Sequence, residues 1–102
     1  MLDKAVIKER INQHKSQMKE MGIDFIGLFG SYVREEQHEG SDIDLLISFE
    51  KDKETFNNFM AICYLLEEIF EGERVEVVTK NGLSPYIGPK ILNEVEYVQI
   101  AA

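Results

Sequence analysis

The chain has 102 residues, of which 44% are hydrophobic and 29% are charged, and these values predict one compact soluble domain spanning residues 1–102. The net charge of −8 argues against a nucleic acid held through its phosphates, so we expect no direct nucleic-acid binding. The single cysteine, Cys63, excludes a disulfide within the chain and indicates a reducing compartment.

The longest unbroken apolar run begins at Met60 and ends at Leu66, and it is far too short to span a bilayer. The first residues open a charged pattern that is unlike a signal peptide. We therefore expect a cytoplasmic protein that does not associate with a membrane.

Hydrophobic spacing predicts seven elements along the chain. Apolar residues about three, four or seven positions apart predict an amphipathic helix over residues 3–21, ended by Gly22. The apolar run that follows, bounded by glycines, predicts a buried strand. The remaining segments read as a short helix, a strand, a long helix, a strand and a last short helix with Pro85 near its start. The predicted ranges are 3–21, 23–29, 31–36, 42–49, 55–71, 74–79 and about 86–95.

The predicted long helix has apolar residues on more than one face, because residues 60–66 are all apolar. Two arrangements explain this pattern. Either the helix is buried on two sides within the domain, or one side meets another chain in a homo- or hetero-oligomer. The sequence does not separate them.

Two carboxylates open the second predicted strand. Residues two apart on a strand point to the same face, so Asp42 and Asp44 can hold one hard cation while Ile43 points into the core. Mg²⁺ prefers oxygen ligands and keeps open positions for substrate phosphates. This pair is therefore a candidate metal site.

Gly30 and Ser31 follow the first predicted strand. A glycine lets the backbone approach a phosphate, and the free N–H groups at a helix start bind anions. Arg34 lies one turn further on, on the same face as Ser31. The alternative is an ordinary N-cap followed by an arginine paired with Glu35, Glu39 or a nearby aspartate.

Glu76 is flanked by valines on the third predicted strand, where a buried carboxylate needs a partner. It lies either on an edge strand in contact with water or beside Asp42 and Asp44 at a metal. A strand–helix–strand crossover predicts that the second and third strands are parallel, so the three carboxylates can converge at one end. The Gly30 turn reaches that end only if the first strand is antiparallel to the second.

These considerations predict an α/β fold of the α+β type, with a small mixed three-stranded sheet flanked by helices in the order αβαβαβα. Three carboxylates with a glycine-serine turn and an arginine fit two-metal nucleotidyl transfer. In that chemistry Asp42 and Asp44 would bridge the metals and Glu76 would bind the catalytic metal. Gly30, Ser31 and Arg34 would hold the outgoing phosphates.

The combination of Gly30-Ser31, Ser41-Asp42-Ile43-Asp44 and Glu76 within its valine run resembles the minimal nucleotidyltransferases of the DNA polymerase β superfamily. The resemblance covers nearly the whole chain and implies the nucleotidyltransferase fold, with Ser41 joining the nucleotide-binding residues. It also implies an antitoxin that transfers AMP from ATP, with Mg²⁺, to a tyrosine of a HEPN-domain toxin. Glu76 stands where this family commonly has aspartate.

Two hypotheses about function follow. The leading one is a Mg²⁺- and ATP-dependent protein adenylyltransferase with Asp42, Asp44 and Glu76 as catalytic and metal-binding residues. The alternative is a weakly active or inactive module of the same fold that neutralises its partner by direct occlusion through the helix around residues 60–66. Whether Glu76 supports catalysis separates the two.

Overall fold

In the computed structural model, which describes residues 2–101, four strands form one mixed sheet in the order β3-β2-β1-β4. The central strand β1 is antiparallel to both β2 and β4, whereas β2 and β3 are parallel. The strands are β1 Ile23–Phe29, β2 Ile43–Phe49, β3 Val75–Thr79 and β4 Glu96–Gln99. The helices are α1 Lys4–Gln13, α2 Lys15–Glu20, α3 Phe56–Ile69 and α4 Gly88–Glu94, with a 3₁₀ turn η1 at Lys80–Gly82.

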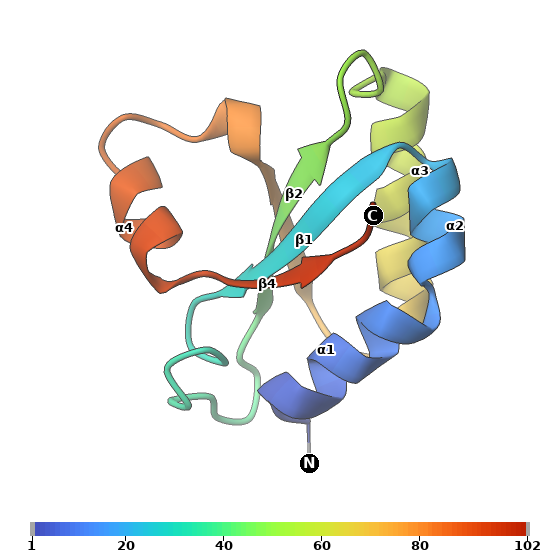
Figure 1. Ribbon diagram of the computed structural model, residues 1–102. Helices are drawn as coiled ribbons and strands as arrows, with labels where there is room; N and C mark the ends of the chain where they lie inside the picture. Colours follow the sequence, from blue (N-terminus) through green and yellow to red (C-terminus); the bar gives the residue numbers. More distant parts are fainter. Residues whose placement is uncertain (1, 102) are drawn as a thin grey trace.

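The helices lie on both sides of the sheet. Figure 1 shows α1, α2 and α3 against one face and α4 on the other side. The core lies between the sheet and the first three helices, where alternate residues of β1 and β2 pack against apolar helix residues. Its fully buried members include Ile7, Ile11, Met18, Ile26, Leu45, Ile47, Ile62, Leu66 and Phe70.

The predicted mixed α+β fold is confirmed, but the predicted number of strands is wrong. β4 adds a fourth strand and pairs with β1 from Phe25↔Gln99 to Leu28↔Glu96. This strand has only four residues, and only Val98 among them is buried. A segment this short gives no clear alternating pattern, because its strand conformation depends on pairing with β1.

The first predicted helix is divided into α1 and α2 at His14. The His14 imidazole Nδ1 makes a 2.9 Å hydrogen bond with the Arg10 carbonyl, and the His14 amide donates to Ile11 instead. Because the side chain occupies the carbonyl that the helical backbone would use, the helix axis is interrupted there. Gly22 follows α2 with φ +80° and is buried, as expected for a glycine that ends a helix.

The predicted short helix over residues 31–36 is a series of turns. The amides of Val33 and Arg34 both donate to the Gly30 carbonyl, and the Glu36 amide donates to Ser31. Glu35 has φ +58°, which lies in the left-handed region and cannot continue a right-handed helix. Ser31 therefore does not begin a helix, and the helix N-terminus predicted to bind an anion is not formed by these residues.

The long helix α3 packs against the sheet by one side only. Ile62, Leu65 and Leu66 are buried, whereas Phe56 and Tyr64 are 77% and 62% exposed. Of the two alternatives left open by the sequence, burial of this helix on two sides within the domain is therefore wrong. Contact of the outer side with another chain stays a prediction.

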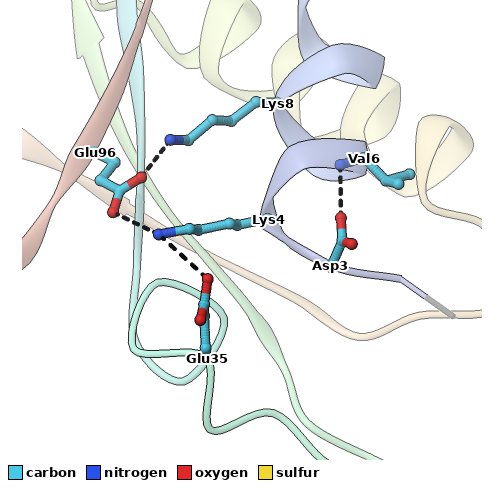
Figure 2. A network of polar contacts seen from close by, with 6 residues as sticks. All are labelled: Asp3, Lys4, Val6, Lys8, Glu35 and Glu96. Atoms are coloured by element: carbon cyan, nitrogen blue, oxygen red, sulfur yellow. Dashed lines mark hydrogen bonds and ion pairs between the residues drawn. The ribbon is translucent and has the colours of Figure 1, made fainter.

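An ion-pair network joins α1 to β4 (Figure 2). The Glu96 carboxylate accepts from Lys4 at 3.1 Å and from Lys8, and Lys4 also lies 3.8 Å from Glu35. These partly buried pairs hold the N-terminal helix to the edge strand. Within residues 2–101, every helix is too short or too polar to cross a bilayer.

Candidate functional site

The turn after β1 is built around Gly30. Its φ of +81° lies in the region that residues with a side chain rarely adopt. A Cβ at this position would collide with the carboxylate of Asp44, whose strand position pairs with Phe29. Glycine is therefore required here both for the backbone angle and for the close approach of the turn to Asp44.

Asp44 and Glu76 are directly opposite one another on the parallel strands β2 and β3. They lie on the sheet face away from the main core, because the flanking residues Ile43 and Leu45 point into it. β3 is an edge strand and Glu76 is exposed. Both explanations offered for Glu76 from the sequence therefore hold in part: it lies on an edge strand and beside an aspartate.

The electrostatic surroundings of Asp44 disfavour its charge. Burial, a hydrogen bond with the Glu76 carboxylate, and the charges of Glu76 and Asp42 together raise the pKa of Asp44 to about 6. The positive charge of Arg34 opposes this shift of the Asp44 pKa. A bound cation would relieve the same repulsion, so a raised pKa fits a carboxylate placed to bind metal.

Asp42 precedes β2 and forms an ion pair with Arg74, which precedes β3. Arg74 Nε lies 2.9 Å from Asp42 Oδ1, and Arg74 Nη2 donates to Asp42 Oδ2 at 3.3 Å. Oδ1 is buried and accepts no hydrogen bond, because the close Nε lacks the alignment that a hydrogen bond requires. Arg74 is not among the site residues predicted from the sequence. Extending the parallel register by one residue from Ile43↔Val75 would have placed it opposite Asp42.

Two other predicted site residues, Ser41 and Arg34, have side-chain partners within the protein. Ser41 Oγ accepts from the His38 amide at 2.9 Å and closes the loop before β2. Arg34 donates to Glu36 at 2.8 Å and to both Glu94 oxygens at 2.8 and 3.1 Å. Arg34 is therefore paired with acidic side chains, as in the alternative interpretation, but the partners are Glu36 and Glu94 and not Glu35, Glu39 or an aspartate. Binding of phosphates by Ser31, Arg34 and Ser41 stays a prediction.

A cavity of about 550 Å³ opens beside Asp42 and Glu76. It is lined mostly by acidic side chains, and Arg74 contributes the single positive charge among the lining residues. The lining consists of Asp42, Glu67, Glu73, Arg74, Val75 and Glu76.

The donor chemistry of this edge fits a hard divalent cation, although the side chains are not arranged around one. Among residues 2–101, no three His, Cys, Asp or Glu side chains are grouped as metal ligands. Asp42 is turned toward Arg74, while Asp44 lies between Glu76 and the Gly30 turn. The buried, unbonded oxygen of Asp42 and the repulsion at Asp44 are both features that an oxygen-ligated cation would satisfy. Binding of a cation by Asp42 therefore requires that its ion pair with Arg74 break.

Comparison with known proteins assigns the family. A model described as "Nucleotidyltransferase domain" matches residues 11–98, which include every predicted site residue. The chain belongs to the nucleotidyltransferase domain family. The predicted family is confirmed, and the chain is a nucleotidyltransferase by descent.

Relatives of this nucleotidyltransferase align along nearly their whole length. Protein adenylyltransferase MntA of Thermococcus cleftensis is 38% identical over 99 residues, covering 96% of this chain and 98% of the relative. A solved structure described as a candidate minimal nucleotidyltransferase superposes with a TM-score of 0.77 and 30% identity, covering 93% of this chain and 95% of that one. A toxin–antitoxin crystal structure with AMP-PNP superposes with a TM-score of 0.68 at 20% identity, covering 93% of this chain and 73% of that one. The last match shows a shared fold.

Proposed function

We propose that this protein is a cytoplasmic antitoxin that transfers AMP from ATP, with Mg²⁺, to a tyrosine hydroxyl of a HEPN-domain toxin. The observation that carries the proposal is the pairing of Asp44 with Glu76 directly against the Gly30 turn. The relative named protein adenylyltransferase MntA supports transfer of AMP to a protein. The solved toxin–antitoxin complex with AMP-PNP supports a toxin as the acceptor and a nucleoside triphosphate as the donor.

In this proposal Asp42, Asp44 and Glu76 hold two divalent cations. Bound Mg²⁺ would polarise the α-phosphate and stabilise both the attacking and the leaving oxygen. Binding also needs Asp44 ionised. Because its pKa is about 6 in the cation-free protein, the carboxylate is mostly charged above neutral pH and ready to bind.

The chemical step is an in-line displacement at the α-phosphorus. The tyrosine oxygen forms a bond to the α-phosphorus while the bond to the α,β-bridging oxygen breaks, and pyrophosphate leaves. The hydroxyl proton passes to a nearby carboxylate, for which Glu76 is the most exposed of the three. The backbone of the Gly30 turn, with Ser31 and Arg34, would hold the departing phosphates.

The second candidate function is neutralisation by occlusion, without chemistry. One observation favours it: the outer side of α3 exposes Phe56 and Tyr64. The resemblance to the minimal nucleotidyltransferases also implies an aspartate at the position where this chain has Glu76. A longer side chain changes the reach of a ligand by one methylene, and Mg²⁺ tolerates little departure from octahedral geometry.

One experiment separates these functions. The protein is incubated with its HEPN partner, ATP and Mg²⁺, and the partner is weighed by intact mass spectrometry. We expect the partner to gain the mass of one adenylyl group, that is AMP less one water, and this gain should be lost with the Asp42→Asn/Asp44→Asn variant and retained with Asp52→Asn. Asp52 is a matched control, since it is exposed and its φ of +64° suits asparagine equally well. No adduct, with toxin inhibition intact in the double variant, would leave occlusion as the function.

A further inference from the structure

The ion pair between Arg74 and Asp42 occupies the position where a cation would bind. Both Asp42 oxygens face the guanidinium, one at 2.9 Å from Nε and the other at 3.3 Å from Nη2. Mg²⁺ binds carboxylate oxygens at about 2.0–2.1 Å and tolerates little distortion. A guanidinium and a divalent cation therefore cannot both hold the same face of this carboxylate.

Arg74 is held at this position by little besides Asp42. Its side chain is 84% exposed, whereas that of Asp42 is 29% exposed. Its release would consequently uncover almost no apolar surface. Glu67 and Glu73 line the same cavity, so a released guanidinium stays in an acidic environment where the loss of one partner costs little.

We propose that Arg74 is a built-in competitor for the divalent cation: its guanidinium neutralises Asp42 in the cation-free protein and leaves when the cation binds. This inference rests on the proposed function, because it concerns the same cation site. It assigns Arg74 a role in setting cation affinity, through Asp42, with no contact to ATP or acceptor required.

The competition has a reason in the charges of the site. Asp42, Asp44 and Glu76 are close enough that their repulsion contributes to the shifted pKa of Asp44. The positive charge of Arg74 compensates one of these three carboxylates while no cation is bound. The same charge opposes an incoming cation. The guanidinium therefore weakens cation binding by the free energy of the Arg74–Asp42 ion pair, which must break.

The test measures binding of Mn²⁺ alone, without nucleotide, by isothermal titration calorimetry and by the loss of the free-ion EPR signal. Arg74→Gln is expected to bind Mn²⁺ about two- to fivefold more tightly than the wild type, the range that an exposed ion pair is worth. Arg74→Lys keeps the charge but cannot bridge both oxygens, so its affinity should fall between the two. Arg10→Gln, which removes one positive charge from the exposed side of α1, should leave the affinity unchanged.

A second readout follows the guanidinium itself. The Nε–Hε resonance of Arg74 in the wild type should shift as Mg²⁺ is added, and should be insensitive to Mg²⁺ in Asp42→Asn. Suppose that the wild type binds Mn²⁺ through Asp42. If Arg74→Gln then binds Mn²⁺ no more tightly than the wild type does, the competition is overturned and the proposed function stands. A wild type whose Mn²⁺ binding is the same as that of the Asp42→Asn/Asp44→Asn variant would overturn both.

Discussion

Replacing Asp44 with asparagine should stabilise the cation-free protein at neutral and alkaline pH. Asp44 is held between Glu76 on β3 and the Gly30 turn, and its folded-state pKa is raised from 3.8 to about 6. Asparagine has nearly the same shape, carries no charge, and can donate a hydrogen bond to Glu76. The substitution therefore removes the repulsion and keeps the packing.

The size of the gain follows from the pKa. A shift of about two units corresponds to about 3 kcal/mol at 1.36 kcal/mol per unit, and partial exposure of Asp44 to solvent reduces this to about 1–2 kcal/mol. The native state binds the extra proton between pH 4 and 6, so wild-type stability decreases as pH rises through this window. The stability of Asp44→Asn does not decrease in this way. Its gain in stability over the wild type should be full at pH 8 and mostly gone at pH 4.

The assay is thermal unfolding at pH 4 and pH 8 in the presence of EDTA, with Asp52→Asn as the control for loss of an exposed aspartate. We expect Asp44→Asn to raise the melting temperature by about 5–15 °C at pH 8, given 4–8 °C per kcal/mol for a domain of this size. A gain of equal size at both pH values, or none at pH 8, would refute the assignment of the destabilisation to the Asp44 charge.

Three further predictions concern single side chains. Gly30→Ala should cost about 2–4 kcal/mol in urea unfolding, because it combines backbone strain at φ +81° with collision against Asp44. Gly40→Ala, with φ +87° and open space around its Cβ position, should cost only the strain of about 1–2 kcal/mol, and equal losses at both glycines would contradict the collision. Glu96→Gln should destabilise the protein by about 1 kcal/mol at pH 7, and the loss should fade on titration below pH 4, because hydrogen bonds from Lys8 and Lys4 lower the pKa of Glu96. Arg34→Gln should weaken ATP binding in calorimetry with little change in stability, because exposed ion pairs contribute little, and unchanged ATP affinity would remove this residue from the phosphate site.

The arrangement of the site strands could be predicted because two constraints acted together. The helix between β2 and β3 required a parallel crossover, and the shared site required β1 to run antiparallel to β2. Both orientations are found, and they bring Asp44 and Glu76 into the same register. Residue spacing was sufficient to locate β1, β2 and β3, because each of them is longer than four residues and bounded by loop residues.

The missed features depend on contacts between distant segments. β4 is a strand because β1 offers it a free edge. Glu35 adopts a left-handed conformation in a turn that is tied back to Gly30 and Ser31. Arg74 belongs to the site through pairing of β2 with β3, whereas by itself it is one charged residue before a valine run. Local patterns carry none of this information.

Asp44 and Glu96 show how one small sheet separates stability from chemistry. Glu96 is paired with two lysines, which lower its pKa and hold α1 to the edge of the sheet. Asp44 faces other carboxylates across β2 and β3, and its pKa is displaced in the opposite direction. A domain of about 100 residues has only about 5–15 kcal/mol of stability, so burying the Asp44 charge beside other carboxylates costs a substantial fraction of it. The positive charge at this edge is provided by Arg74, from an exposed side chain that can move away. The carboxylates are thus left incompletely neutralised at the one place where a divalent cation would complete the neutralisation.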